Sequence, residues 1–284
     1  MCNFRCLALI LLSLISVHTE KAAAQPQQTE TWKKIENLPW QFGPGQGAIA
    51  NKATIAIPKN YGFLSAEGTD KFLVILDNLP TKDGYTLAPE DLKWFSIFSF
   101  LATGYVKDDE KIDPDDLLKS LKEQNLRGNQ ERKARGLPEL ILEGWFISPH
   151  YDLQTKRLEW ATKLSEANGE ITVNYSIRLL SRSGVMSALL VSDPASLERD
   201  VRTFKATLNS FSFNVGENYS EFRTGDKIAE YGLAGLIIGG AAAAAAKTGL
   251  FKILGKFIWV IFIGIGALVL GVWRSLFGSK KTPT

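Results

Sequence analysis

Residues 140–191 read LILEGWFISPHYDLQTKRLEWATKLSEANGEITVNYSIRLLSRSGVMSALLV. Four runs rich in aliphatic, aromatic and β-branched residues predict four strands: Leu140 to Ile147, Arg157 to Leu164, Ile171 to Leu180 and Val185 to Val191. Short segments rich in turn-forming residues separate them, at 149–152, 167–169 and 182–184. Short links join antiparallel neighbours, whereas parallel strands need a crossover of about a dozen residues. The stretch therefore predicts an antiparallel meander.

Strand and helix patterns alternate upstream of the meander. Ala53 to Ile57, which stops at Pro58, and Trp94 to Leu101 have the composition of strands. Residues 69–79 instead place apolar side chains at helical spacing. Gln25 to Thr31 is polar, and we expect it to be irregular.

A longer helix is predicted just before the meander. Asp113 is a good N-cap residue, and Pro114 fits the first helical position. Gly136 and Pro138 predict the end of this helix. Its second half, residues 127–135, is basic, and we expect it to be exposed to solvent.

Downstream of the meander, Asp193 and Pro194 predict the start of another helix. Its apolar residues recur at steps of three and four: Leu197, Val201, Phe204 and Leu208. Phe211 and Phe213 suggest a last short strand. An antiparallel sheet with helices packed on it is an α+β fold, and this is the predicted class.

The first 24 residues have the layout of a secretory signal peptide. Arg5 gives a basic start, residues 6–17 are apolar, and Ala22 to Ala24 supply small residues at the cleavage point. At about 1.5 Å per residue the apolar run is too short to span roughly 30 Å of hydrocarbon. An uncleaved N-terminal anchor is the alternative.

Cleavage after Ala24 would remove Cys2, Cys6 and His18, and with them several kinds of catalytic or metal site. The remaining chain has no cysteine and one histidine, His150, which excludes a Cys/His zinc site, a cysteine nucleophile and a redox pair. Its formal charge falls from 33 − 30 = +3 to 31 − 29 = +2, so nothing indicates a nucleic-acid partner. No glycine-rich phosphate loop is present, and we expect no cofactor.

A transmembrane helix is predicted over residues 253–274. Its centre, Phe257 to Trp273, is seventeen residues without a charge, bounded by Lys256 and Arg274. A basic tail, residues 275–284, follows. The alternative is a buried core helix, but only eleven residues follow Trp273 to cover one.

Residues 226–252 form a segment rich in glycine and alanine before that span. Gly235 and Gly239 make a G-x-x-x-G pair, a spacing that lets helices pack closely in lipid. The segment is either a juxtamembrane helix or the first membrane helix of a hairpin of two, and hydropathy favours one span. Residues 25–225 then make up an extracytoplasmic α+β domain.

Five groups of residues carry a resemblance to a known family. They are residues 104–118 (GYVKDDEKIDPDDLL), Gly144-Trp145 with Pro149, Tyr151 and Asp152, Leu158-Glu159-Trp160-Ala161, Val173-Asn174-Tyr175 with Arg178 and Arg182-Ser183-Gly184, and residues 226–234 (DKIAEYGLA). They resemble the bacterial family catalogued as domain of unknown function 2167, over roughly residues 38–252. The resemblance implies a membrane-anchored protein and brings no catalytic assignment. At the level of fold only, the meander and following helix are similar to sandwich domains of the photosystem PsbP type.

An acidic stretch is the candidate metal site. Asp108, Asp109 and Asp113 could offer oxygen ligands to calcium. Their spacing is not that of an EF-hand loop, and Asp113 already has a helix to cap, so capping and solvation are the competing interpretation.

Two further groups are candidates for ligand binding. His150, Tyr151 and Asp152 could supply a general acid or base, although polar residues are expected in such a turn. Arg178 and Arg182 share the parity of one strand face. They could bind an anion, or pair with a carboxylate such as Glu159 on the neighbouring strand.

We expect a non-enzymatic module on the inner membrane, with its main domain in the periplasm. Its partners would be the lipid bilayer and an envelope protein, or a second copy bound through the membrane helices. The alternative is an envelope hydrolase that uses Asp or Glu, with Arg178 and Arg182 steering an anionic substrate.

Overall fold

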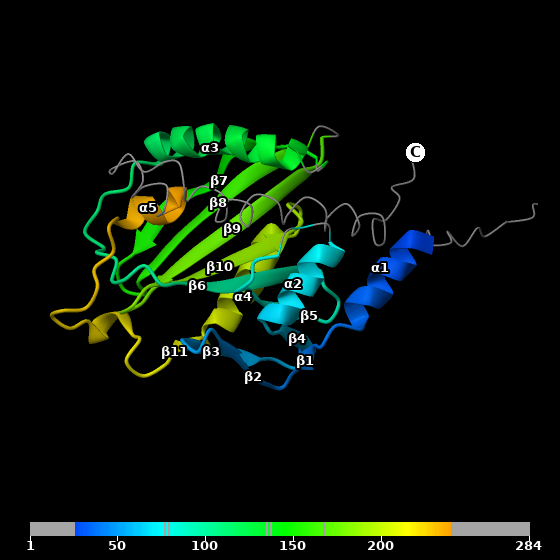
Figure 1. Cartoon of the computed structure of the whole chain (residues 1–284), viewed down its shortest axis with the longest axis horizontal. Coiled ribbons are helices and arrows are strands. Elements are labelled where there is room, and N and C mark those ends of the chain that lie inside the picture. The colour runs from blue at the N-terminus through cyan, green and yellow to red at the C-terminus, as the bar shows by residue number, and fades with distance from the viewer. Residues whose placement is uncertain are drawn as a thin grey trace, which may run out of the picture.

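The computed structural model describes residues 26–239 except 77, 79, 135, 137, 167 and 168. The predicted signal peptide (1–24), transmembrane helix (253–274) and basic tail (275–284) lie outside this part of the chain. Within it, no helix is both long and apolar enough to cross a bilayer. An eight-stranded antiparallel sheet with helices packed on it makes up the domain, which confirms the predicted α+β class (Figure 1).

The predicted meander forms half of the main sheet. It consists of β7 (Leu140–Asp152), β8 (Arg157–Glu166), β9 (Ile171–Leu180) and β10 (Val185–Ser192), each antiparallel to the next. The strand β6 (Trp94–Leu101), also predicted, pairs with β10. The full order is β1-β4-β5-β6-β10-β9-β8-β7, so β7 is an edge strand.

Short strands complete the main sheet and form a second one. β1 (Gln41–Phe42), β4 (Tyr61–Leu64) and β5 (Tyr85–Pro89) extend the main sheet beyond β6. β2 (Gly45–Ile49), β3 (Ala53–Ile57) and β11 (Ser212–Phe213) form a separate three-stranded sheet. β3 and β11 match predicted strands, whereas β1, β2, β4 and β5 were not predicted.

The helices cover the two faces of the main sheet unequally (Figure 1). α2 (Ala66–Ile75), α3 (Pro114–Ala134) and α5 (Leu233–Ile238) pack on one face, and α1 (Pro26–Glu36) contacts α2. α4 (Leu197–Leu208) and the small sheet pack on the other face.

Three helices differ from their predictions. α2 runs over Ala66–Ile75 and not over 69–79, because the Ser65 side chain caps it by accepting a hydrogen bond from the Gly68 N–H. The polar segment expected to be irregular is helical from Pro26, because the buried Ile35 packs the helix against the α2 side of the core. α4 begins at Leu197 and not at Pro194, because the Asp193 carboxylate accepts a hydrogen bond from the Ala195 N–H and closes a turn first (2.8 Å).

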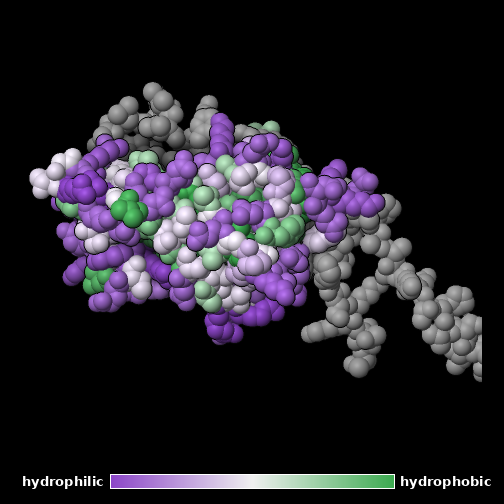
Figure 2. All heavy atoms as spheres, turned by 90° about the horizontal axis from the view of Figure 1, so that it is seen from below, coloured by the Kyte–Doolittle hydropathy of each residue, from purple (hydrophilic) through white to green (hydrophobic). Residues whose placement is uncertain are grey.

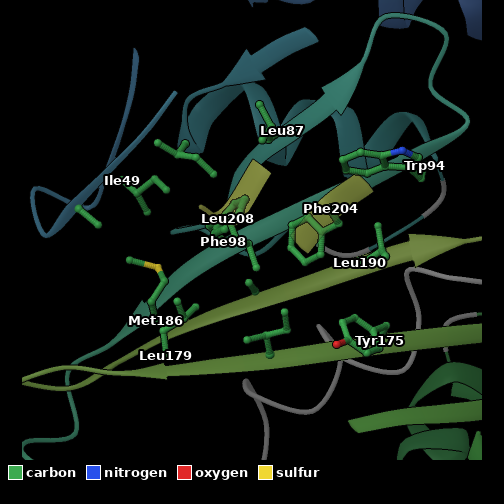
Figure 3. Close-up of a cluster of buried hydrophobic side chains, with 14 of the residues drawn as sticks. Ile49, Leu87, Trp94, Phe98, Tyr175, Leu179, Met186, Leu190, Phe204 and Leu208 are labelled. Carbon is green, nitrogen blue, oxygen red and sulfur yellow. The ribbon is translucent and has the colours of Figure 1, made fainter. Parts of the chain in front are cut away.

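The core between the main sheet and α4 is aromatic and aliphatic. Figure 3 shows Phe204 and Leu208 of α4 among side chains of the sheet. The ring centroid of Phe204 lies 6.0 Å from that of Phe98 on β6 and 5.9 Å from that of Trp94. The periodic residues that predicted α4 are thus the ones that hold it on the sheet.

The other face of the sheet has a second core, under α3 and α5. Trp160 and Leu180 of the sheet contribute to it, and so do Leu233, Leu236 and Ile237 of α5, all of which are at most 5% exposed. The packed domain therefore continues to Ile238, beyond the predicted boundary at residue 225.

The outer edge of β7 is covered by side chains of α3. Asn129 accepts a hydrogen bond from the Leu140 N–H (3.0 Å) and donates one to its carbonyl (2.8 Å). Asn125, one turn earlier, accepts from the Leu142 N–H (3.1 Å). The prediction that the second half of α3 is solvent exposed is wrong on this face, where Asn129 and Arg132 are buried. These amides occupy backbone groups that an open edge would offer to another chain.

Candidate functional site

Segments that are far apart in the sequence meet at one end of the main sheet (Figure 1). The Tyr105 N–H donates to the Lys227 carbonyl (2.7 Å), and the Ala229 N–H donates to the Tyr105 carbonyl (2.8 Å). Other side chains from the same segments gather around this pair of hydrogen bonds. We call the group the motif cluster, because most members belong to the family motifs: Tyr105, Asp108, Glu110, Tyr151, Lys156, Arg182, Tyr219 and Asp226.

Asp108 joins the first acidic motif to the end of β7. Its carboxylate accepts hydrogen bonds from the Tyr151 hydroxyl (2.9 Å) and from Lys156 Nζ (2.8 Å). Partial burial alone would raise the pKa of Asp108, but the hydrogen bonds from Lys156 and Tyr151 outweigh it and hold the pKa below its usual value. Burial and the bond to Asp108 raise the pKa of Tyr151, so its phenol stays protonated at neutral pH. The structure thus joins Asp108 and Tyr151, which were predicted as members of two separate candidate sites.

Aromatic stacking fixes the 3-10 turn η1 (Tyr219–Glu221) in the same cluster. The ring of Tyr105 lies 4.4 Å from that of Tyr219 and 4.3 Å from that of Phe222. The Tyr219 hydroxyl donates to the carbonyl of Val106 (2.8 Å). Lys156 Nζ also lies 5.4 Å from the Tyr219 ring centroid, within the range of a cation–π contact.

Arg182 and Asp226 form a two-pronged ion pair. Nε and Nη2 of Arg182 each donate to a different oxygen of Asp226, at 2.7 Å. The hydrogen bonds from Arg182 and from the Arg223 N–H lower the pKa of Asp226 to about 2. Arg182, a predicted anion ligand, therefore binds an anion that the chain itself supplies.

A second ion pair lies beside this one. Lys52 Nζ contacts Glu217 Oε1 (2.5 Å) and Ser183 Oγ (3.1 Å), and the Ser183 hydroxyl also donates to Glu217. Glu217 in turn accepts a backbone hydrogen bond from Arg182 through its carbonyl (2.9 Å). The small sheet, which carries Lys52 in its hairpin, is thus tied to the motif cluster.

Glu110 holds the start of α5. Its carboxylate accepts a hydrogen bond from the Ala234 N–H (2.9 Å). A Cβ at Gly232 would lie 2.3 Å from the same carboxylate, so a larger residue at this position would displace the carboxylate from the Ala234 N–H.

The G-x-x-x-G pair has a different role from the predicted one. A Cβ at Gly235 would lie 2.7 Å from the Tyr231 side chain, so this glycine packs inside the domain. Gly239 ends α5, with a φ of 86°. The two glycines therefore do not form one face of a continuous helix that could pack against a second membrane helix.

The predicted pairing of Arg178 with Glu159 is wrong. Glu159 lies opposite Ile177 in the register of β8 and β9, so Glu159 and Arg178 point to opposite faces of the sheet. Arg178 is 3% exposed, with its guanidinium carbon 4.8 Å from the Trp160 ring centroid. Burial lowers the pKa of Arg178 to about 9, which leaves it charged at neutral pH.

Glu159 instead connects the sheet to α4. Its carboxylate contacts the Tyr175 hydroxyl and Lys205 Nζ, each at 2.5 Å, and lies 3.5 Å from His150 Nε2. His150 is exposed on the edge strand. Asp152, the third residue of the predicted turn site, accepts hydrogen bonds from the Gln154 and Thr155 N–H groups. His150, Tyr151 and Asp152 therefore each have a separate set of contacts.

The predicted metal ligands are likewise divided. Asp113 caps α3 by accepting from the N–H groups of Asp115 (3.0 Å) and Asp116 (3.3 Å), Asp108 binds Lys156, and Asp109 is exposed. Among residues 26–239 as described, no three histidine, cysteine or acidic side chains are arranged to hold a metal ion.

A groove beside α1, at the opposite end of the sheet, was not predicted. It has a volume of about 340 Å³, and its lining includes Trp32, Trp40, Phe42, Glu36 and Glu90. Figure 2 shows a hydrophilic α1 at the right, with apolar residues at the surface where it meets the body. These residues come from short, separate elements, so no sequence period connects them.

Fold and contacts together define one α+β domain whose motif residues bind one another. The chain belongs to the family described as "Protein of unknown function (DUF2167)", whose profile matches residues 41–271. This confirms the resemblance noted from the motifs. No curated protein sequence matches the chain. Among solved structures, it is similar to the solution structure of cyanobacterial PsbP (CyanoP) from Synechocystis sp. PCC 6803, with 8% identity over 60% of this chain and 92% of that one. The TM-score of 0.37 is too low to establish a shared fold.

Proposed function

We propose that this protein is a membrane-tethered, non-enzymatic module of the bacterial envelope that binds another envelope component or stabilises a complex. The observation that carries the proposal is the motif cluster. Its charged groups satisfy one another and fix residues 217–238 to the sheet. A domain that must present a surface at a fixed place on a membrane needs such a rigid connection to its anchor.

The position of α5 supports the same function. Ile238, the last residue of α5, precedes the apolar run that begins at Phe257 by 19 residues. If that run spans the membrane, the residues between Ile238 and Phe257, at no more than about 3.6 Å each, limit how far the motif cluster can stand from the bilayer. The predicted signal peptide would place the domain on the periplasmic side of the inner membrane.

The contacts of the predicted site residues do not support the alternative function, an envelope hydrolase. It requires Arg178, Arg182 and a carboxylate to converge on one substrate. Arg178 and Glu159 lie on opposite faces of the sheet, and Arg182 is bound to Asp226. Tyr175 and Lys205 both bind the Glu159 carboxylate, which leaves it poorly placed to act on a substrate.

The test is a pull-down of tagged full-length protein from native cells in a mild maltoside detergent. We expect a partner at a fixed stoichiometry, and a weaker yield with Asp226→Asn, which loosens the cluster. Glu198→Gln, on the exposed side of α4, is the matched control and should retain the partner. Hydrolysis of phosphate or carboxylate esters by the purified chain, abolished by Glu159→Gln, would establish the hydrolase instead.

Protease protection in spheroplasts tests the location separately. With tags at residue 25 and at the C-terminus, we expect the first to be cleaved from outside and the membrane fraction to retain the chain. Recovery of uncut full-length protein in the cytosol would contradict the tethered arrangement.

A further inference from the structure

We propose that the groove beside α1 binds an organic ammonium ion, either a free molecule such as choline or the ammonium headgroup of a lipid. This site goes beyond the proposed function, because it lies at the other end of the sheet from the motif cluster and shares no residue with it. Its volume of about 340 Å³ is within the range of small-molecule sites.

The floor of the groove is built for close approach. Phe42, Gly62 and Ala88 lie side by side across β1, β4 and β5. A Cβ at Gly62 would lie 2.7 Å from the Trp40 ring and 3.4 Å from that of Phe42. The missing side chain at Gly62 therefore lets the Trp40 ring lie directly on the sheet, beside Phe42.

Aromatic rings supply the walls. Trp40 is held in place by the hydrogen bond from its Nε1 to the Ile35 carbonyl (2.9 Å) and by an edge contact with Phe72 (5.8 Å between centroids). Trp32 of α1 also lines the groove, and Phe42 is 56% exposed. Aromatic faces attract quaternary and other alkylated ammonium ions through their quadrupoles.

The negative charge of the groove also favours a cationic ligand. Glu36 and Glu90 line it, and its lining includes no lysine or arginine. Neither carboxylate forms an ion pair with any residue in the described part of the chain. A second groove, between α1 and α2, is lined by Lys34, Lys71 and Asp70, so it lacks this negative, aromatic character.

The binding test uses full-length protein labelled with 5-fluorotryptophan, in maltoside detergent at constant ionic strength. Choline chloride is titrated, and the fluorine resonances of Trp32 and Trp40 are assigned from Trp32→Phe and Trp40→Phe. We expect saturable shifts of these two resonances, while that of Trp94, 4% exposed in the core, stays in place. The neutral isostere 3,3-dimethylbutan-1-ol should bind at least about ten-fold more weakly, because it lacks the charge.

Isosteric variants test the role of the carboxylates. Glu36→Gln and Glu90→Gln should each weaken choline binding about two- to five-fold, as expected for exposed charge pairs. Glu67→Gln is the matched control, because Glu67 is an exposed glutamate on α2 that pairs with Lys71 outside this groove. Unchanged thermal unfolding midpoints would show that all three variants fold.

A comparison of nanodiscs with phosphatidylcholine, phosphatidylethanolamine or phosphatidylglycerol identifies the source of the ligand. Shifts with the first two but not the third assign the site to a lipid headgroup, and shifts with free choline alone assign it to a soluble cation. The proposal is overturned if choline causes no saturable shift of the Trp32 and Trp40 resonances at concentrations up to about 50 mM, a range that would reveal even a millimolar Kd. Equal binding of the neutral isostere would also overturn it. Neither result bears on the pull-down that tests the proposed function.

Discussion

Arg182 donates a hydrogen bond to each carboxylate oxygen of Asp226, both at 2.7 Å, and thereby joins the turn after β9 to the segment that leads into α5. The two residues are 44 positions apart in the sequence. The same turn is held from the other side, where the Arg182 N–H donates to the Glu217 carbonyl. This pair is therefore the most direct place to test whether the motif cluster fixes the C-terminal part of the domain.

Replacing Asp226 with Asn should destabilise the chain in a pH-dependent way. The hydrogen bond from Arg182 lowers the pKa of Asp226 to about 2 from an ordinary 3.8. A carboxylate with a lowered pKa adds stability that is complete above the unfolded value and is lost as the pH falls through the folded one. In calorimetry, the midpoint difference between wild type and Asp226→Asn should be constant above about pH 5 and vanish between about pH 4 and pH 2. A difference that does not change with pH would mean that the ion pair is not responsible.

Truncation should show where the domain ends. A chain of residues 26–239 keeps the buried Leu233, Leu236 and Ile237, whereas a chain of residues 26–225 loses them. Each buried aliphatic side chain is worth about 1.5–3 kcal/mol, so the shorter chain should lose about 4–9 kcal/mol in urea unfolding. A point variant tests the same boundary with a smaller change, since Leu236→Ala should lower the free energy of unfolding by about 2–5 kcal/mol. Val215→Ala is the control, because Val215 is 97% exposed. Equal unfolding of the two truncated chains would restore the boundary at residue 225.

The amides of α3 that cover the β7 edge should be costly to remove. Asn129→Ala leaves the Leu140 N–H without its side-chain acceptor in a buried position, which should cost about 1–3 kcal/mol. The exposed edge should also promote self-association, visible as increased light scattering. Gln130→Ala, at the adjacent exposed position, should change neither measurement. If Asn129→Ala behaved like Gln130→Ala, backbone groups of β7 would have to be satisfied in another way.

The strongly patterned elements were predictable from the sequence. β3, β6 and β9 begin and end at the predicted residues, because continuous runs of β-branched and aromatic residues stop at Pro58, after Leu101 and at Ser181. The short strands β1 and β4 were not, because two to four residues carry too little pattern and these strands form only by pairing with their neighbours in the sheet, β1 with β4 and β4 with β5. α1 was missed for a related reason, since Ile35 is the one buried side chain among residues 30–36, the part of this polar helix whose side chains the structure describes.

The candidate site was predictable only in its parts. Asp108, Tyr151 and Arg182 were singled out, but their partners Lys156 and Asp226 come from the tertiary fold. The alternation of side chains along β9 predicts which residues share a face with Arg178. It does not predict how β8 and β9 are paired, and this pairing decides that Glu159 points to the opposite face. The groove beside α1 had no signal at all, because its residues share neither a period nor a motif.

Tyr175→Phe tests whether Glu159 is structural. The Tyr175 hydroxyl donates to this carboxylate at 2.5 Å, with the two residues 1% and 6% exposed. A buried hydrogen bond to a charged group contributes about 1.5–3 kcal/mol, and we expect that loss in urea unfolding. Tyr85→Phe is the control, because the Tyr85 ring packs on the same core by stacking with Phe63. Lys205 remains beside Glu159 in the variant, so the carboxylate keeps a cation that anchors α4. If Tyr175→Phe were as stable as Tyr85→Phe, the Glu159 carboxylate would not depend on the phenol, and it would again be a candidate for acid–base chemistry with His150.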